Sequence, residues 1–204
     1  MLDAVLIGGQ VIYVAIALAS IAGMAVVVER CMRLLPLRTR FRTGFAEVEQ
    51  ALRAGGGGVK PALKGLAGQD DPMARTLRRG LEASAGGTEH VRAVAQEAAQ
   101  QEVAGLERGL GALAVVGQVA PLLGLLGTVI GLMQAFRAAA AAERVTPALL
   151  ADGIYHALGT TAAGLCVAIP AWIAYAALSG LTGRLIDRLE FAAAELPLLC
   201  ERQP

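Results

Sequence analysis

Four residues in the second half of the chain carry side chains suited to handling protons. Thr128, Thr160 and Thr161 supply hydroxyl groups, and His156 supplies an imidazole. A hydroxyl both donates and accepts a hydrogen bond and has no charge to desolvate, so it suits an ion path through apolar surroundings. Histidine titrates near neutral pH and can relay protons. The four residues are therefore candidates for an ion path, provided that their segments cross a membrane.

The segments that hold them are long and uncharged. No charged residue lies between Arg108 and Arg137, a run that as a helix crosses the ~30 Å hydrocarbon layer of a bilayer. Residues 4–28 and 153–183 form two similar runs. The chain has 204 residues, is 55% hydrophobic and has a mean hydropathy of +0.56, which is too apolar for an ordinary soluble domain. We predict an all-α membrane protein with three transmembrane helices and a helical cytoplasmic region, into which long second and third helices extend.

The second and third predicted spans are rich in small residues at helical spacing. In the second span, glycine, alanine, proline and Thr128 recur every three or four residues and form one narrow stripe. Because lipid is as apolar as leucine, helices associate in membranes where small residues let their backbones approach. We therefore expect both spans to pack against other helices. The candidate packing residues are Gly117, Pro121, Gly124, Gly127, Gly131, Gly164 and Pro170.

Thr128 and Thr161 are expected at matching depth. Each lies about eight residues inside the outer end of its span, which at ~1.5 Å per residue is about 12 Å below the outer surface. At that depth they can face one another or a shared lumen. The alternative is that each hydroxyl bonds to a carbonyl one turn earlier, as threonine often does in spans. Three polar groups at matched depth favour the ion path.

His156 has two interpretations that the sequence leaves open. An ionisable side chain inside a span suggests function, and Asp152 lies one helical turn away and can pair with it. A neutral histidine near the interface, bonded to Asp152 or to water, is equally consistent.

Basic residues indicate how the chain is oriented. Five arginines between Arg30 and Arg42 follow the first span, and Arg184 and Arg188 follow the third, so both flanks are expected in the cytoplasm. A solvated basic face or an anchor to anionic lipid also explains the first cluster. The acidic start and full-length apolar run favour a retained first span over a signal peptide. The predicted ranges are 1–28 for the periplasmic N-terminus and first span, 29–108 for a cytoplasmic helical region, 109–136 for the second span, 137–151 for a periplasmic connection, 152–183 for the third span and 184–204 for a cytoplasmic tail.

Helices are expected throughout the cytoplasmic region. An apolar face from Leu34 to Leu52 predicts that the first helix continues beyond the membrane, and Gly55 to Gly58 predict a flexible link. Asp71 followed by Pro72 predicts a helix start, as does Thr146 followed by Pro147. Thr88 is expected to cap a long helix that runs unbroken into the second span.

Other classes of function have little support in the sequence. Cys31, Cys166 and Cys200 lack metal-ligand spacing, so free thiols and no metal site are expected. A net charge of +1 gives no nucleic-acid signal, and no nucleophile, phosphate loop or cofactor motif suggests an enzyme.

The segments APLLGLLGTVIGLMQAF and GIYHALGTTAAGLCVAIPA closely resemble the two signature spans of the ExbB/TolQ/MotA family of ion-driven motor proteins. The resemblance assigns Thr128 and Thr161 to the family's ion path and puts His156 where relatives usually have glutamate. It implies a homopentamer in the bacterial inner membrane, around a dimer of ExbD/TolR-type single-span proteins. Each partner span would carry the titrating aspartate, because this sequence has no acid deep in any span. The motor would convert proton-motive force into work, with a TonB/TolA-like protein as a further partner.

Two other hypotheses remain alongside the motor. A structural scaffold without ion flux would use the stripe for packing alone. A self-sufficient channel would depend on His156 and conduct without a partner. The sequence does not decide whether the driving ion is H⁺ or Na⁺, or which system the motor drives.

Overall fold

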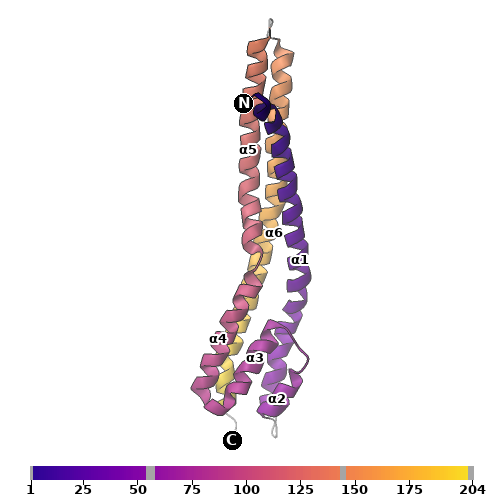
Figure 1. The fold of residues 1–204 in the computed structure, drawn as a ribbon. Helices are drawn as coiled ribbons and strands as arrows, with labels where there is room; N and C mark the ends of the chain where they lie inside the picture. Colours follow the sequence, from indigo (N-terminus) through magenta and orange to yellow (C-terminus); the bar gives the residue numbers. More distant parts are fainter. Residues whose placement is uncertain (1, 54–57, 143–145, 202–204) are drawn as a thin grey trace. The chain divides into compact units, whose positions relative to one another are not determined.

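The computed structural model describes residues 2–53, 58–142 and 146–201, and every regular element within these ranges is helical (Figure 1). This confirms the all-α prediction. Three helical stretches, Gln10–Arg53, Thr88–Ala141 and Leu150–Glu201, are long and apolar enough to cross a membrane. The elements are α1 (Leu2–Arg53), α2 (Val59–Gly65), α3 (Pro72–Glu82), a short 3-10 helix η1 (Ala83–Gly86), α4 (Thr88–Glu107), α5 (Leu110–Ala141) and α6 (Pro147–Glu201).

The chain divides into two compact units, which we treat separately. Unit 1 combines Met1–Glu29 with Gly109–Ala177, and unit 2 combines Arg30–Arg108 with Leu178–Pro204. The assignment of these parts to the membrane and to its two sides stays a prediction.

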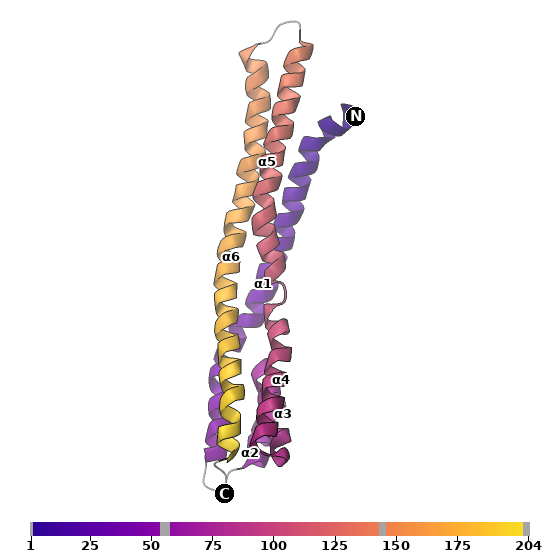
Figure 2. The same cartoon turned by 90° about the vertical axis from the view of Figure 1, so that its left-hand side faces the viewer.

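Unit 1 has small residues inside and large apolar residues outside. Figures 1 and 2 both show α5 and the first half of α6 side by side. The buried positions of α5 include Gly117, Ala120, Gly124 and Gly127, whereas Leu122 remains 62% exposed. A water-soluble core shows the opposite arrangement, because burial of large apolar side chains drives its folding. The inverted pattern is that of helices packed in lipid.

Unit 2 has the opposite pattern. Its core is built from large side chains of the second half of α1, of α3 and α4, and of the end of α6. Outside this core, Phe45 and the exposed Phe191 make an edge-on ring contact, with centroids 5.9 Å apart. Hydrophobic burial in water stabilises such a core. Its largest fully buried residues include Leu34, Phe41, Leu66, Met73, Leu77, Leu81, Val91, Leu185, Leu189 and Leu196.

The first and third predicted helices run as expected. α1 continues without interruption to Arg53 and buries Leu34 and Leu52 on its predicted apolar face. α6 is a single helix that starts at Pro147, the predicted first position. The predicted flexible link at Gly55–Gly58 lies, apart from Gly58, outside the described residues.

Two predictions about the second long helix were wrong. The helix is not continuous, because α4 ends at Glu107 and α5 begins at Leu110, with Gly109 between them at a φ of 82°. That left-handed conformation strongly favours glycine and stops helical hydrogen bonding. Thr88 does not cap α4 either: the preceding Gly87, at a φ of 86°, occupies the N-cap position, and no side-chain cap bond forms there.

The start of α3 is confirmed and well defined. Asp71, only 4% exposed, precedes Pro72 and accepts a hydrogen bond from the backbone N–H of Ala74 at 3.1 Å. Such a cap satisfies one of the N–H groups that a helix start leaves without a partner.

We expect Asp71→Ala to lower the free energy of unfolding by about 1 kcal/mol, because the Ala74 N–H loses its acceptor. Asp71→Asn keeps a side-chain oxygen at the cap and should cost only a few tenths of that. Hydrogen exchange of the α3 amides measures the difference, and equal protection in both variants would contradict the capping role.

Candidate ion-path site

The candidate site lies on the contact between α5 and α6, which is closed by glycines. A methyl group added to Gly124 would meet Thr161 Cα at 2.9 Å, and one added to Gly131 would meet Ala157 Cβ at 2.8 Å. On the other helix, a methyl group on Gly164 would lie 2.5 Å from the carbonyl oxygen of Ala120. These separations are too short for any real Cβ, so the two backbones nearly touch. We call this contact the glycine seam.

Two neighbouring threonines of α6 converge on one carbonyl of α5. Thr160 is buried in the seam and its hydroxyl lies 2.7 Å from the carbonyl oxygen of Ala157 and 3.2 Å from that of Gly124. Thr161 is half-buried and donates to the same Gly124 oxygen at 3.0 Å. The two hydroxyls therefore fix the register of the helices, and Thr161 also reaches the partly open edge of the seam.

Thr128 lies one helical turn from Gly124 and is partly exposed. Its hydroxyl donates to the carbonyl oxygen of Leu125 at 2.7 Å, the local bond expected as the alternative to a polar partner. Thr128 and Thr161 do not bond to each other within one chain. Each hydroxyl oxygen retains lone pairs that can accept a hydrogen bond from water or from a protonated acid.

His156 lies outside the seam on the exposed part of α6. Its side chain is 70% exposed and its Nε2 lies 3.8 Å from Oδ1 of Asp152, whose side chain is 78% exposed. The backbone carbonyl of His156 accepts a hydrogen bond from the Tyr13 hydroxyl of α1 at 3.4 Å. The structure therefore brings Thr160 and Thr161 together on Gly124, whereas the Thr128 hydroxyl bonds within α5 and the His156 side chain is exposed.

The remaining predicted packing residues differ in burial. Gly117 is buried, and a methyl group on it would meet the ring of Trp172 at 3.0 Å. Gly127 is also buried, and a methyl group added to it would lie 2.6 Å from Thr160 Cβ. Pro121 is half-buried, and Pro170 is exposed beside an apolar cavity of unit 1.

Sequence reasoning missed one residue that extends the seam. Gly153 packs on Ala135, with 3.1 Å from an added methyl group to Ala135 Cα. The signal was present in the third span as a run of small residues at three- and four-residue spacing that continues toward its start. These positions are Gly153, Ala157, Thr160, Gly164, Ala168 and Ala171.

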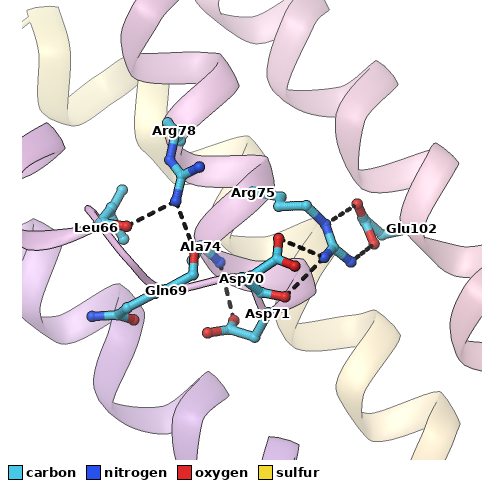
Figure 3. Close-up of polar contacts among 8 residues, drawn as sticks. All are labelled: Leu66, Gln69, Asp70, Asp71, Ala74, Arg75, Arg78 and Glu102. Atoms are coloured by element: carbon cyan, nitrogen blue, oxygen red, sulfur yellow. Dashed lines mark hydrogen bonds and ion pairs between the residues drawn. The ribbon is translucent and has the colours of Figure 1, made fainter.

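Unit 2 contains a second polar cluster, drawn in Figure 3, that the sequence did not predict. Arg75 Nε and Nη2 donate to the two carboxylate oxygens of Glu102 at 2.7 and 2.6 Å, and Nη1 donates to Asp70 Oδ1 at 3.0 Å. These bonds, the Glu102 pair foremost, raise the pKa of Arg75 above its already high value. Arg78 donates to the carbonyl oxygens of Leu66 and Gln69 at 2.8 and 2.7 Å (Figure 3). The cluster ties α3 to α4 and to the segment after α2.

Within the described residues, no three histidine, cysteine or acidic side chains gather where they could hold a metal ion. The three cysteines are free thiols, as expected. Burial raises the pKa of Cys200, which favours its neutral form.

Comparison with known proteins decides the family. The model of the MotA/TolQ/ExbB proton channel family matches residues 68–191, which include the glycine seam and its threonines. The chain belongs to the MotA/TolQ/ExbB family. Among its members, the ExbB biopolymer transport protein of Neisseria meningitidis is 32% identical over 211 residues, which cover 95% of this chain and 91% of that protein.

Other MotA/TolQ/ExbB relatives match over shorter stretches. TolQ of the Tol-Pal system from Pseudomonas aeruginosa is 44% identical over 98 residues, 48% of this chain and 42% of that protein. A putative ExbB homolog of Methanothermobacter thermautotrophicus is 35% identical over 134 residues, 66% of this chain and 47% of that protein. The chain spans less than half the length of these two relatives. With three helices able to cross a bilayer, this member of the family is a membrane protein.

Proposed function

We propose that the chain is an ExbB/TolQ-like subunit of a proton-driven motor in the bacterial inner membrane. In this proposal five copies surround a dimer of an ExbD/TolR-type single-span protein, with the N-terminus in the periplasm and the C-terminus in the cytoplasm. The observation that carries the proposal is the pair of partly exposed hydroxyls, Thr128 and Thr161, in spans that have no acidic residue deep inside them, since Asp152 lies at the edge of the third. A path of this kind needs its titrating acid from another chain.

The hydrogen bonds of the two threonines suggest their role. Both hydroxyls donate to backbone carbonyls of their own unit, so their oxygens are left as acceptors. An acceptor stabilises the protonated form of a carboxyl group, because that form donates an O–H. The threonines would therefore hold the partner's aspartic acid while it is neutral and release it when it loses its proton.

The energy for movement comes from the membrane potential. One proton crossing the membrane releases ~2.3 kcal/mol per 100 mV, so several protons suffice for a mechanical step of the partner dimer. A TonB/TolA-like protein would carry this movement to a transport or envelope system. We favour H⁺ as the driving ion, since a hydroxyl acceptor matches a carboxylic acid; Na⁺ is the alternative.

The test compares proton flux in proteoliposomes that hold the full chain and its single-span partner under an imposed potential. We expect Thr161→Val and Thr128→Val each to lower the flux by about tenfold or more, equivalent to about 1.4 kcal/mol, while Thr161→Ser keeps it. Thr43→Val is the matched control, because the Thr43 hydroxyl bonds to carbonyls one turn earlier as Thr128 does but lies in unit 2.

Two results would contradict the proposal. Full activity in both valine variants, with assembly intact, would indicate a structural scaffold. Conductance without any partner, lost in His156→Ala, would indicate a self-sufficient channel instead.

A further inference from the structure

Unit 2 contains a cavity of about 460 Å³ that the motor proposal does not use. Its walls come from α1, α3, α4 and the segment before α3, and all of them belong to unit 2. The volume lies in the range of sites for small ligands. Four arginines and two acids line it, so its charge is predominantly positive.

The two acids of the cavity are already engaged. Glu102 and Asp70 both bind the guanidinium of Arg75, as Figure 3 shows. The two carboxylates outweigh the charge of Arg75 by one, so these three side chains contribute no excess positive charge. The other three arginines of the lining all lie on a second wall, formed by α1.

That wall presents three arginines on one helical face. Arg30, Arg33 and Arg40 are separated by three and seven residues, a spacing that places them on the same side of α1. Arg30 is only 3% exposed and its Nη1 donates to the carbonyl oxygen of Gly105 in α4 at 3.3 Å. Arg33 and Arg40 are exposed, and Arg40 has no ion-pair partner in the part of the chain that the structure describes.

The position of the cavity along α1 points to the ligand. Arg30 and Arg33 follow directly on the uncharged run that ends at Val28, so they lie at the level of lipid headgroups if that run crosses the bilayer. Apolar side chains, among them Leu37 and Leu106, share the lining with the arginines. A ligand with an anionic phosphate and an adjoining apolar part fits both features.

We propose that this cavity binds the phosphate headgroup of an anionic phospholipid from the leaflet next to unit 2. Arg33 and Arg40 contact the phosphate, and Arg30, held by Gly105, contributes a fixed charge behind it. The bound lipid connects α1 with α3 and α4. The inference needs α1 to span the membrane, but it does not depend on ion flux or on the direction of the chain.

The experiment uses the full-length protein in neutral detergent, titrated with phosphatidylglycerol or phosphatidylcholine, with bound lipid counted by native mass spectrometry. We expect saturable binding of phosphatidylglycerol only. Arg40→Gln should weaken it about fivefold, the affinity change expected for one arginine near an anionic lipid. Arg38→Gln is the matched control: it removes one charge from the same exposed segment of α1 but does not line the cavity, and should change affinity less than twofold.

Three outcomes would overturn the proposal. Equal binding of both lipids would show that no anion is recognised. Equal weakening by Arg38→Gln and Arg40→Gln would show diffuse attraction without a site. Displacement of the lipid by glycerol 3-phosphate at the same concentration would make the ligand a soluble phosphate. Circular dichroism of each variant verifies that its helices are intact, and Arg33→Gln repeats the test from a second position in the cavity.

Discussion

Replacing Gly164 by alanine is expected to lower the free energy of unfolding of the protein by about 1–3 kcal/mol, the cost of overpacking a close contact. The new methyl group would lie 2.5 Å from the Ala120 carbonyl oxygen and 3.1 Å from Gly124 Cα. Both atoms belong to the backbone of α5 and cannot rotate away as a side chain can. The helices must separate, which also stretches the bond from Thr161 to Gly124. The effect should therefore lie at the upper end of the range.

Unfolding in mixed micelles of increasing denaturing detergent measures this loss. Gly111→Ala is the matched control, because Gly111 is also a glycine of the α5–α6 pair but has nothing within 4 Å of an added methyl group. Gly111 is the second residue of α5, so that substitution should change the free energy of unfolding by less than about 0.5 kcal/mol. Equal midpoints for the two variants would show that the seam is not a close contact.

Replacing Glu102 by alanine is expected to lower the free energy of unfolding by about 1.5 kcal/mol. The change removes both carboxylate acceptors of Arg75, bonded at 2.6 and 2.7 Å, and leaves that guanidinium with Asp70. Bonds to charged groups are worth about 1.5–3 kcal/mol, and the lower end applies because the Arg75 side chain is 38% exposed and screened by water.

The control for this pair is Glu89→Ala. Glu89 and Arg92 also form an ion pair, but their atoms are 3.6 Å apart and the side chains are 87% and 42% exposed. Its loss should cost less than about 0.5 kcal/mol. Hydrogen exchange of the α3 and α4 amides separates the two cases, and equal exchange rates in both variants would show that the cluster contributes little to unit 2.

The helical architecture could be predicted because composition and periodicity both report it. Uncharged runs define the spans, and the apolar face of α1 beyond Arg30 matches the core of unit 2. The cap at Asp71 could be predicted because it depends only on residues within one helical turn. Each of these signals lies within a short window of sequence, where propensity and side-chain spacing act directly.

The details of the site were less accessible to sequence reasoning. Neighbouring residues on a helix can both border the same stripe. Spacing alone therefore did not show whether Gly127 or Thr128, and Thr160 or Thr161, lies closest to the other helix. In the structure Gly127 and Thr160 are buried and meet in the seam, whereas Thr128 and Thr161 are only partly buried.

Other features escaped prediction for different physical reasons. The break at Gly109 depends on one left-handed residue inside a continuous apolar pattern. The pairing of Arg75 with Glu102 joins residues 27 positions apart and follows from how α3 packs on α4. No window of local sequence contains that information.

The close approach of the Gly124 backbone to the backbone of Thr160 and Thr161 has a mechanical consequence. Interlocking side chains can rotate and yield, whereas backbones in direct contact leave no slack between α5 and α6. These two helices must therefore move together as one rigid unit. If the proposed motor function holds, any sliding against a neighbouring helix falls on the exposed leucine and isoleucine surfaces of the pair, such as Leu122 and Ile173.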